Sequence, residues 1–153
     1  MIQRKQSLFM LLSVFMMVAC LSLPIGYFRP NGMGLDKVIY NLYVTGMTKD
    51  GSLDFTICPM FIILVTAAAI TLLNIFAYRN RSLQAKLCLV SAFMEVAWYV
   101  VGIVYNQNLC PEDCTFVPHW SDSFPFVSLI LLLMSRRAIL ADERLVRAAD
   151  RIR

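Results

Sequence analysis

Glu95 is the residue whose position has the clearest chemical consequence. It is the one charged residue between Lys86 and Tyr105, in a stretch that is otherwise mostly apolar. A carboxyl group in such a run is costly to ionise, so it must be protonated, paired or exposed to a polar cavity. It could serve a proton-coupled site of a small transporter, or it could be a protonated, hydrogen-bonded contact between packed helices. We favour the packing contact.

The cysteines offer a second chemistry. Cys110 and Cys114 lie four residues apart in a polar segment that also holds the only histidine, His119. A disulfide between them would close a small ring and contribute about 2 kcal/mol. The alternatives are unpaired thiols, a thiol-redox centre that also uses Cys20 and Cys58, and a zinc site completed by His119 and a nearby acid. We favour the disulfide, because the sequence has no Cys-x-x-Cys redox motif.

Other catalytic and binding motifs are missing from the sequence. It has no Ser-His-Asp set with supporting spacing, no glycine-rich phosphate loop and no pair of acids within an apolar run. Its basic segments lack the aromatic interleaving of nucleic-acid-binding surfaces. We therefore predict no catalytic, cofactor-binding or metal-ligating residues and no nucleic-acid partner.

The elements that must position these residues are long apolar runs. Residues 57–78 form an uncharged run that is followed by Arg79 and Arg81. As a helix this run would be about 33 Å long, close to the ~30 Å hydrocarbon core of a bilayer. The chain is 59% hydrophobic and 16% charged, whereas soluble domains are roughly 45–50% apolar and about 25% charged. The sequence therefore predicts a membrane protein in contact with the lipid bilayer.

We expect a single domain over residues 1–153 and an all-α fold. The predicted architecture is a four-transmembrane-helix bundle, with spans at about 8–28, 57–78, 86–105 and 121–140. The first run could instead be a signal peptide with a lipoprotein-like cleavage site before Cys20. We favour a retained span, because the apolar run continues beyond Cys20 and exceeds the 7–15 residues of a signal-peptide core.

One polar segment carries a strand pattern. Residues 38–45 (VIYNLYVT) are β-branched and aromatic, and a turn signal at 49–51 precedes residues 52–55. This pattern predicts a small extracytoplasmic β-hairpin, with an irregular loop as the alternative.

The basic residues predict the orientation. Eleven of the 14 lysines and arginines lie before residue 6, between residues 79 and 86, or after residue 135. Because Lys and Arg are retained on the cytoplasmic side, both termini are expected in the cytoplasm. The two remaining polar segments are then expected outside.

Polar residues on the second and third spans predict an intramembrane seam. If these spans form an antiparallel pair, Glu95 lies close to the level of Thr71. The residues predicted to line the seam are Glu95, Thr71, Asn74 and Ser91.

The carboxy-terminal segment, residues 136–153, has a helical pattern and is predicted to be a cytoplasmic helix. It is either a solvated continuation of the last span near anionic headgroups or a docking helix for a partner. The charged residues that would dock a partner are Asp142, Glu143, Arg144, Arg147, Asp150 and Arg151.

Three segments carry a family resemblance. The opening MIQRKQSLFMLL, the middle RSLQAKLC and the closing ADERLVRAADRIR resemble an uncharacterised bacterial family of small membrane proteins, domain of unknown function 4293. The resemblance implies four spans, a bacterial inner membrane and a cytoplasmic tail, and it implies no activity. The Cys110/Cys114 pair lies outside the family's pattern.

The function predicted from the sequence is non-enzymatic. We expect an accessory, scaffold or assembly subunit of a membrane complex, whose partner is another subunit or a second copy of the chain. The alternatives are a proton-coupled transporter that uses Glu95 and a thiol-redox protein that uses the outer cysteines.

Overall fold

The computed structural model describes residues 3–30, 32, 36–45, 53–77, 80–109 and 114–150. Within these residues the chain is mostly helical, with a small sheet. The elements in chain order are α1 (Gln3–Ser22), β1 (Gly26–Pro30), β2 (Lys37–Ile39), α2 (Cys58–Phe76), α3 (Arg81–Leu109), β3 (Cys114–Pro118), the 3-10 helix η1 (Trp120–Ser123) and α4 (Phe124–Asp150).

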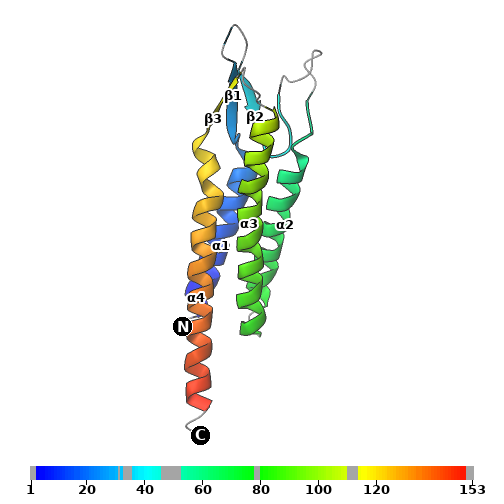
Figure 1. The fold of residues 1–153 in the computed structure, drawn as a ribbon. Coiled ribbons are helices and arrows are strands. Elements are labelled where there is room, and N and C mark those ends of the chain that lie inside the picture. Colours follow the sequence, from blue (N-terminus) through cyan, green and yellow to red (C-terminus); the bar gives the residue numbers. More distant parts are fainter. Residues whose placement is uncertain are drawn as a thin grey trace.

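The helices α1 to α4 lie side by side and form the helical body of the molecule (Figure 1). Helix α1 packs against α2 and α4, and α3 packs against the same two helices. The sheet covers one end of the helical body, and α4 extends past the other helices at the opposite end (Figure 1). Neighbouring helices along the chain are antiparallel, as short connections require.

Three segments have the length and composition of membrane-spanning helices: α2, α3 and Trp120–Val146. The apolar part of α1, Gln6–Ser22, is shorter. Large apolar side chains point outward along the helices, and Phe15, Leu73 and Phe93 are each about two-thirds exposed. Buried positions include many polar side chains, so the usual distribution of a water-soluble domain is inverted.

The predicted first span, residues 8–28, is wrong at its carboxy-terminal end. Helix α1 ends at Ser22, and Gly26–Pro30 forms strand β1. Pro24 explains the difference, because proline lacks a backbone N–H and disfavours helical geometry at the preceding residue. The apolar run continues beyond the helix because Ile25 and Phe28 are buried beneath the sheet.

The side chain of Asn41, in the loop after β2, supplies a hydrogen bond that the end of α1 lacks. The carbonyl of Cys20 would normally accept from the N–H of residue 24, which is a proline. The Asn41 amide donates to this carbonyl at 2.8 Å instead, and the Asn41 carbonyl oxygen accepts from Trp98 Nε1 at 2.8 Å. All three residues are buried. Asn41 therefore joins α1 and α3 beneath the sheet.

The sheet has the order β2-β1-β3, and both pairs are antiparallel. Tyr27 on β1 is opposite Val38 on one side and Val117 on the other. These strands join two distant loops, whereas the sequence predicted a hairpin within residues 38–55, whose turn lies outside the described residues. Of that hairpin, the described residues show one antiparallel bridge, between Val44 and Asp54.

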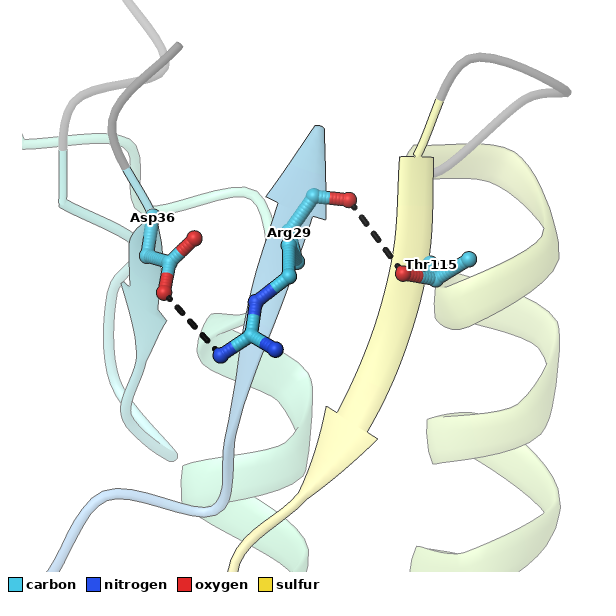
Figure 2. A network of polar contacts seen from close by, with 3 residues as sticks. All are labelled: Arg29, Asp36 and Thr115. Carbon is cyan, nitrogen blue, oxygen red and sulfur yellow. Dashed lines mark hydrogen bonds and ion pairs between the residues drawn. The ribbon is translucent and has the colours of Figure 1, made fainter. Parts of the chain in front are cut away.

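Two polar side-chain contacts at the sheet are exposed and weak. Arg29 on β1 forms a 3.5 Å ion pair with Asp36, and the Thr115 hydroxyl donates to the Arg29 carbonyl at 3.4 Å (Figure 2). Exposed ion pairs contribute roughly 0–1 kcal/mol. The backbones of β1 and β3 lie close together. At Gly26, the first residue of β1, an added Cβ would lie 2.9 Å from the Val117 carbonyl oxygen.

The start of α4 is held by α3. The Tyr99 hydroxyl donates to the Asp122 carbonyl at 2.6 Å and accepts from the backbone N–H of Phe126 at 3.1 Å. The first N–H groups of a helix have no partner within the helix. Tyr99 therefore satisfies one of them and fixes the position where η1 becomes α4.

We expect Asn41→Ala to destabilise the protein by about 2–3 kcal/mol, because it leaves the buried Cys20 carbonyl and the Trp98 N–H without partners. The measurement is the free energy of unfolding of the full chain in detergent. Asn108→Ala, at an exposed position on α3, is the matched control and should change stability by less than about 0.5 kcal/mol. Equal stability of the two variants would contradict the role of Asn41.

Candidate functional site

Glu95 lies on α3 and is fully buried in the helical body. The Ser128 hydroxyl of α4 donates to Glu95 Oε1 at 2.5 Å. The hydroxyl oxygens of Ser128 and Ser13, on α1, are 2.7 Å apart. The carboxyl group therefore lies where α1, α3 and α4 meet.

The direction of these hydrogen bonds follows from the number of hydrogens. A serine hydroxyl has one hydrogen to donate. If Ser128 donates it to Glu95, the hydrogen in the 2.7 Å contact must come from Ser13. The two hydroxyls then form a chain of donors directed at Glu95 Oε1.

Ser128 and Ser135 of α4 each contact both α1 and α3, and we call these two sets of contacts the serine rungs. Ser128 contacts Ser13 of α1 and Glu95 of α3. Seven residues later, Ser135 donates to the Gln6 carbonyl of α1 at 3.3 Å and lies close to Cys88 of α3. The partners on α1 and α3 are also seven residues apart, which is the repeat expected when antiparallel helices cross at about 20°.

The serine rungs were missed by the sequence analysis, although a signal was present. Residues 121, 128 and 135 are all serine at a seven-residue spacing, and all three are buried. Ser121 donates to the Pro24 carbonyl and continues the series at the end near the sheet. Three polar residues on one face of an apolar helix indicate an internal face, because polar groups need partners away from water.

The predicted seam residues are all buried, but they do not form one connected network. Glu95 and Ser91 lie one helical turn apart on α3. Thr71 donates to the Ala67 carbonyl of its own helix at 2.9 Å. Glu95 accepts a hydrogen bond from Ser128 of α4, whereas the sequence placed its partner on the second span.

Asn74 belongs to a separate polar contact near the other end of α2. Its amide donates to the Gln84 carbonyl at 3.0 Å and to the Cys88 sulfur at 3.2 Å. The Gln84 amide donates in return to the Asn74 carbonyl at 3.2 Å. These reciprocal bonds fix the turn between α2 and α3.

The cysteines are only partly described. Cys114, at the start of β3, is disulfide-bonded, while Cys20, Cys58 and Cys88 are free. Cys110 lies outside the described residues. The Cys110/Cys114 pair and the thiol-redox alternative therefore stay predictions.

The predicted zinc set also falls partly outside the described residues, because it needs Cys110. His119 Nδ1 lies 2.9 Å from the Ser121 hydroxyl, at the residue that precedes η1. Among the described residues, no group of three His, Cys, Asp or Glu side chains is close enough to hold a metal ion.

A cavity of about 110 Å³ lies beneath the sheet, between α2 and α3. Its wall is mostly apolar and aromatic, with Trp98, Tyr99 and Phe116 among the lining residues. Asn106 and Asp122 contribute polar groups. Glu95 does not line this cavity, so the serine rungs and the cavity are separate features.

The tail residues occupy different environments. Asp142 forms a 3.1 Å ion pair with Arg81 at the start of α3, and both side chains are partly buried. Glu143 is half-buried and has an interaction within the chain, whereas Arg144 is exposed. For Arg147 and Asp150 the structure describes only the helical backbone, and Arg151 lies outside the described residues.

The Arg81–Asp142 ion pair continues the seven-residue spacing of the serine rungs along α3 and α4. Asp142 follows Ser135 by seven residues, and Arg81 precedes Cys88 by seven. Three contacts between α3 and α4 therefore repeat along one interface, from Glu95 near the middle to Arg81 at its end. This series can hold a buried carboxyl group and fix the direction of α4, but it contains no nucleophile paired with a base.

Comparison with known proteins adds one match. A sequence model of the family described as Domain of unknown function (DUF4293) matches residues 2–152. No curated protein matches the chain.

We expect Ser128→Ala to lower the free energy of unfolding by about 2 kcal/mol, because it removes hydrogen bonds to Glu95 and Ser13 and leaves buried polar atoms without partners. Ser82→Ala, at an exposed position on α3, is the control and should stay within about 0.5 kcal/mol of the parent. Chemical unfolding of both variants in detergent measures the difference. If Ser128→Ala were as stable as its control, the rung would carry no stabilising contact.

Proposed function

The chain belongs to the DUF4293 family, and from this premise we propose that it is a four-span integral membrane protein that acts as a non-enzymatic accessory or assembly subunit of a larger membrane complex. The family description assigns no activity. The proposal therefore depends on the architecture of the described residues.

Membrane insertion is supported by the inverted surface. Exposed apolar side chains follow the outward faces of α2, α3 and α4, and the polar side chains of these helices meet inside. Three segments are long and apolar enough to cross a bilayer. We propose that α1 is the fourth span, because it packs against α2 and α4 along the same direction (Figure 1).

We propose a bacterial inner membrane, with both termini in the cytoplasm and the sheet outside. The positive residues support this orientation. Arg81 and Lys86 at the start of α3 lie at the same end of the helical body as Arg137 and Arg144. Lys and Arg are enriched on the cytoplasmic side of membrane proteins.

The projecting end of α4 carries the proposed partner role. The helix spans Phe124–Asp150 and would be about 40 Å long, roughly 10 Å more than a hydrocarbon core. Beyond Asp142 it continues past the other helices (Figure 1). Leu145 is 63% exposed and Val146 is 44% exposed there. Exposed apolar side chains outside the lipid favour a protein partner.

The direction of this projection is fixed within the chain. The ion pair from Arg81 holds Asp142 against the start of α3. The apolar positions 145 and 146 follow within the next turn and are therefore presented at a defined angle. A rigid, preoriented helix loses less conformational entropy on binding than a flexible tail.

Proton-coupled transport is a second candidate, and one observation favours it. Glu95 Oε2 is buried and has no hydrogen-bond partner, so one atom of the carboxyl group is available to bind a proton or another ligand. Transport would also need a path for a solute, and Glu95 does not line the cavity beneath the sheet.

The orientation can be measured with cysteines introduced one at a time into a Cys58→Ser background, whose own labelling by its four remaining cysteines is subtracted. We expect Asn108→Cys, near the sheet, to react with a membrane-impermeant maleimide in intact cells. Ser82→Cys, at the opposite end of α3, should react only after the membrane is permeabilised. Both positions are exposed, so burial does not explain a difference. The reverse pattern would overturn the proposed orientation.

The partner role can be tested with a photo-crosslinking amino acid at Leu145. We expect one discrete adduct with another membrane-complex subunit. The same group at Phe93, which is similarly exposed but lies in the middle of α3, should give none. An adduct of twice 17.4 kDa would instead indicate a homo-oligomer, and equal diffuse labelling at both positions would contradict a specific tail contact.

A further inference from the structure

Two of the unpartnered polar atoms of the helical body lie together on α3. Among the described residues, the buried side-chain atoms without a hydrogen-bond partner are Gln6 Nε2, Asn74 Oδ1, Ser91 Oγ and Glu95 Oε2. Ser91 and Glu95 are four residues apart, so their side chains share one face of the helix. Both residues are fully buried.

The surroundings of Glu95 contain no cation within the described residues. The helices packed against α3 bring uncharged polar groups toward this face, including Ser13 of α1, Thr71 of α2 and Ser128 of α4. The nearby titratable groups are the thiol of Cys20, the phenol of Tyr99 and the carboxyl group of Asp122 on η1, and all of them are acids. An ionised carboxylate that is buried without a counter-charge is strongly unfavourable. A protonated Glu95 carboxyl group needs only a hydrogen-bond acceptor for its hydrogen.

We propose that Glu95 is a proton-binding site in the middle of the helical body, with the proton on Oε2, which has no hydrogen-bond partner in the structure and reaches the Ser91 hydroxyl by rotation of either side chain. The other oxygen, Oε1, accepts from Ser128, which is itself aligned by Ser13. This arrangement gives both carboxyl oxygens and Ser91 a role. The ligand is a proton, since one carboxyl and a few hydroxyls provide too little charge and too few oxygens to replace the hydration shell of a metal cation.

The proton is expected to be exchangeable rather than permanent. When it leaves, the Ser13–Ser128 donor chain already points at the carboxyl group and can stabilise the charge that develops. Ser91 can rotate its hydroxyl from acceptor to donor. The inference depends only on contacts inside the helical body and is independent of the proposed partner of the tail.

Infrared difference spectroscopy of the purified full-length protein in detergent tests the assignment. We expect a carbonyl-stretch band of a protonated carboxyl group at neutral pH, and we expect it to disappear at high pH. Glu95→Gln should lose this band, whereas Glu143→Gln should keep it. The experiment needs neither a membrane nor a partner, so its failure is distinguishable from failure of the proposed function.

Two serine variants test the geometry and remain informative if Glu95→Gln fails to fold. Ser128→Ala should move the band to higher frequency, because Oε1 loses its donor. Ser91→Ala should keep the band to a higher pH than the parent, because the ionised carboxylate loses a hydroxyl donor, which stabilises it more than an acceptor stabilises the neutral form. A purely structural role for these serines would not move the band.

Three results would overturn the proposal. The first is a folded protein whose spectrum shows no protonated carboxyl band at neutral pH. The second is a band that persists unchanged in Glu95→Gln. The third is loss of the band on replacing potassium by sodium at constant pH and ionic strength, which would assign the site to a metal cation instead of a proton.

Discussion

The hydrogen bond between Ser128 and Glu95 joins two helices around the side chain that is hardest to bury. A carboxyl group among apolar helices is tolerated only where its oxygens have partners. Ser128 supplies one partner, and its contact with Ser13 extends the same network to α1. Because α1 begins the chain and α4 ends it, this point closes the helical body. Any change in the charge of Glu95 must therefore be accommodated by three helices together.

The two ends of the helical body are held by different interactions. At the sheet, distant loops are joined by backbone pairing, and Asn41 and Tyr99 satisfy groups left open at helix ends. At the opposite end, the Asn74–Gln84 amides fix the α2–α3 turn and Arg81 pairs with Asp142. Helix α4 then continues beyond these contacts. The sheet thus covers one end of the helical body, and α4 projects alone from the other end.

The helices could be predicted from the sequence because they depend on local composition, and the sheet could not because it depends on distant pairing. The long apolar runs correctly located α2, α3 and α4. Pro24 was a sufficient local reason to end α1, yet the apolar residues beyond it extended the predicted span. Strand β3 follows α3 by only a few residues but pairs with β1, about 90 residues earlier in the chain. No local pattern specifies that choice of partner.

Only part of the candidate site could be predicted, because its contacts also join segments that are distant in the sequence. Glu95 was conspicuous as a lone charge, but its partner Ser128 is recognisable only when α3 and α4 are aligned in register. Once aligned, Glu95–Ser128, Cys88–Ser135 and Arg81–Asp142 are successive contacts of one interface. The buried carboxyl group and the start of the projecting end of α4 therefore belong to one continuous interface between α3 and α4, although they lie at different depths of the molecule.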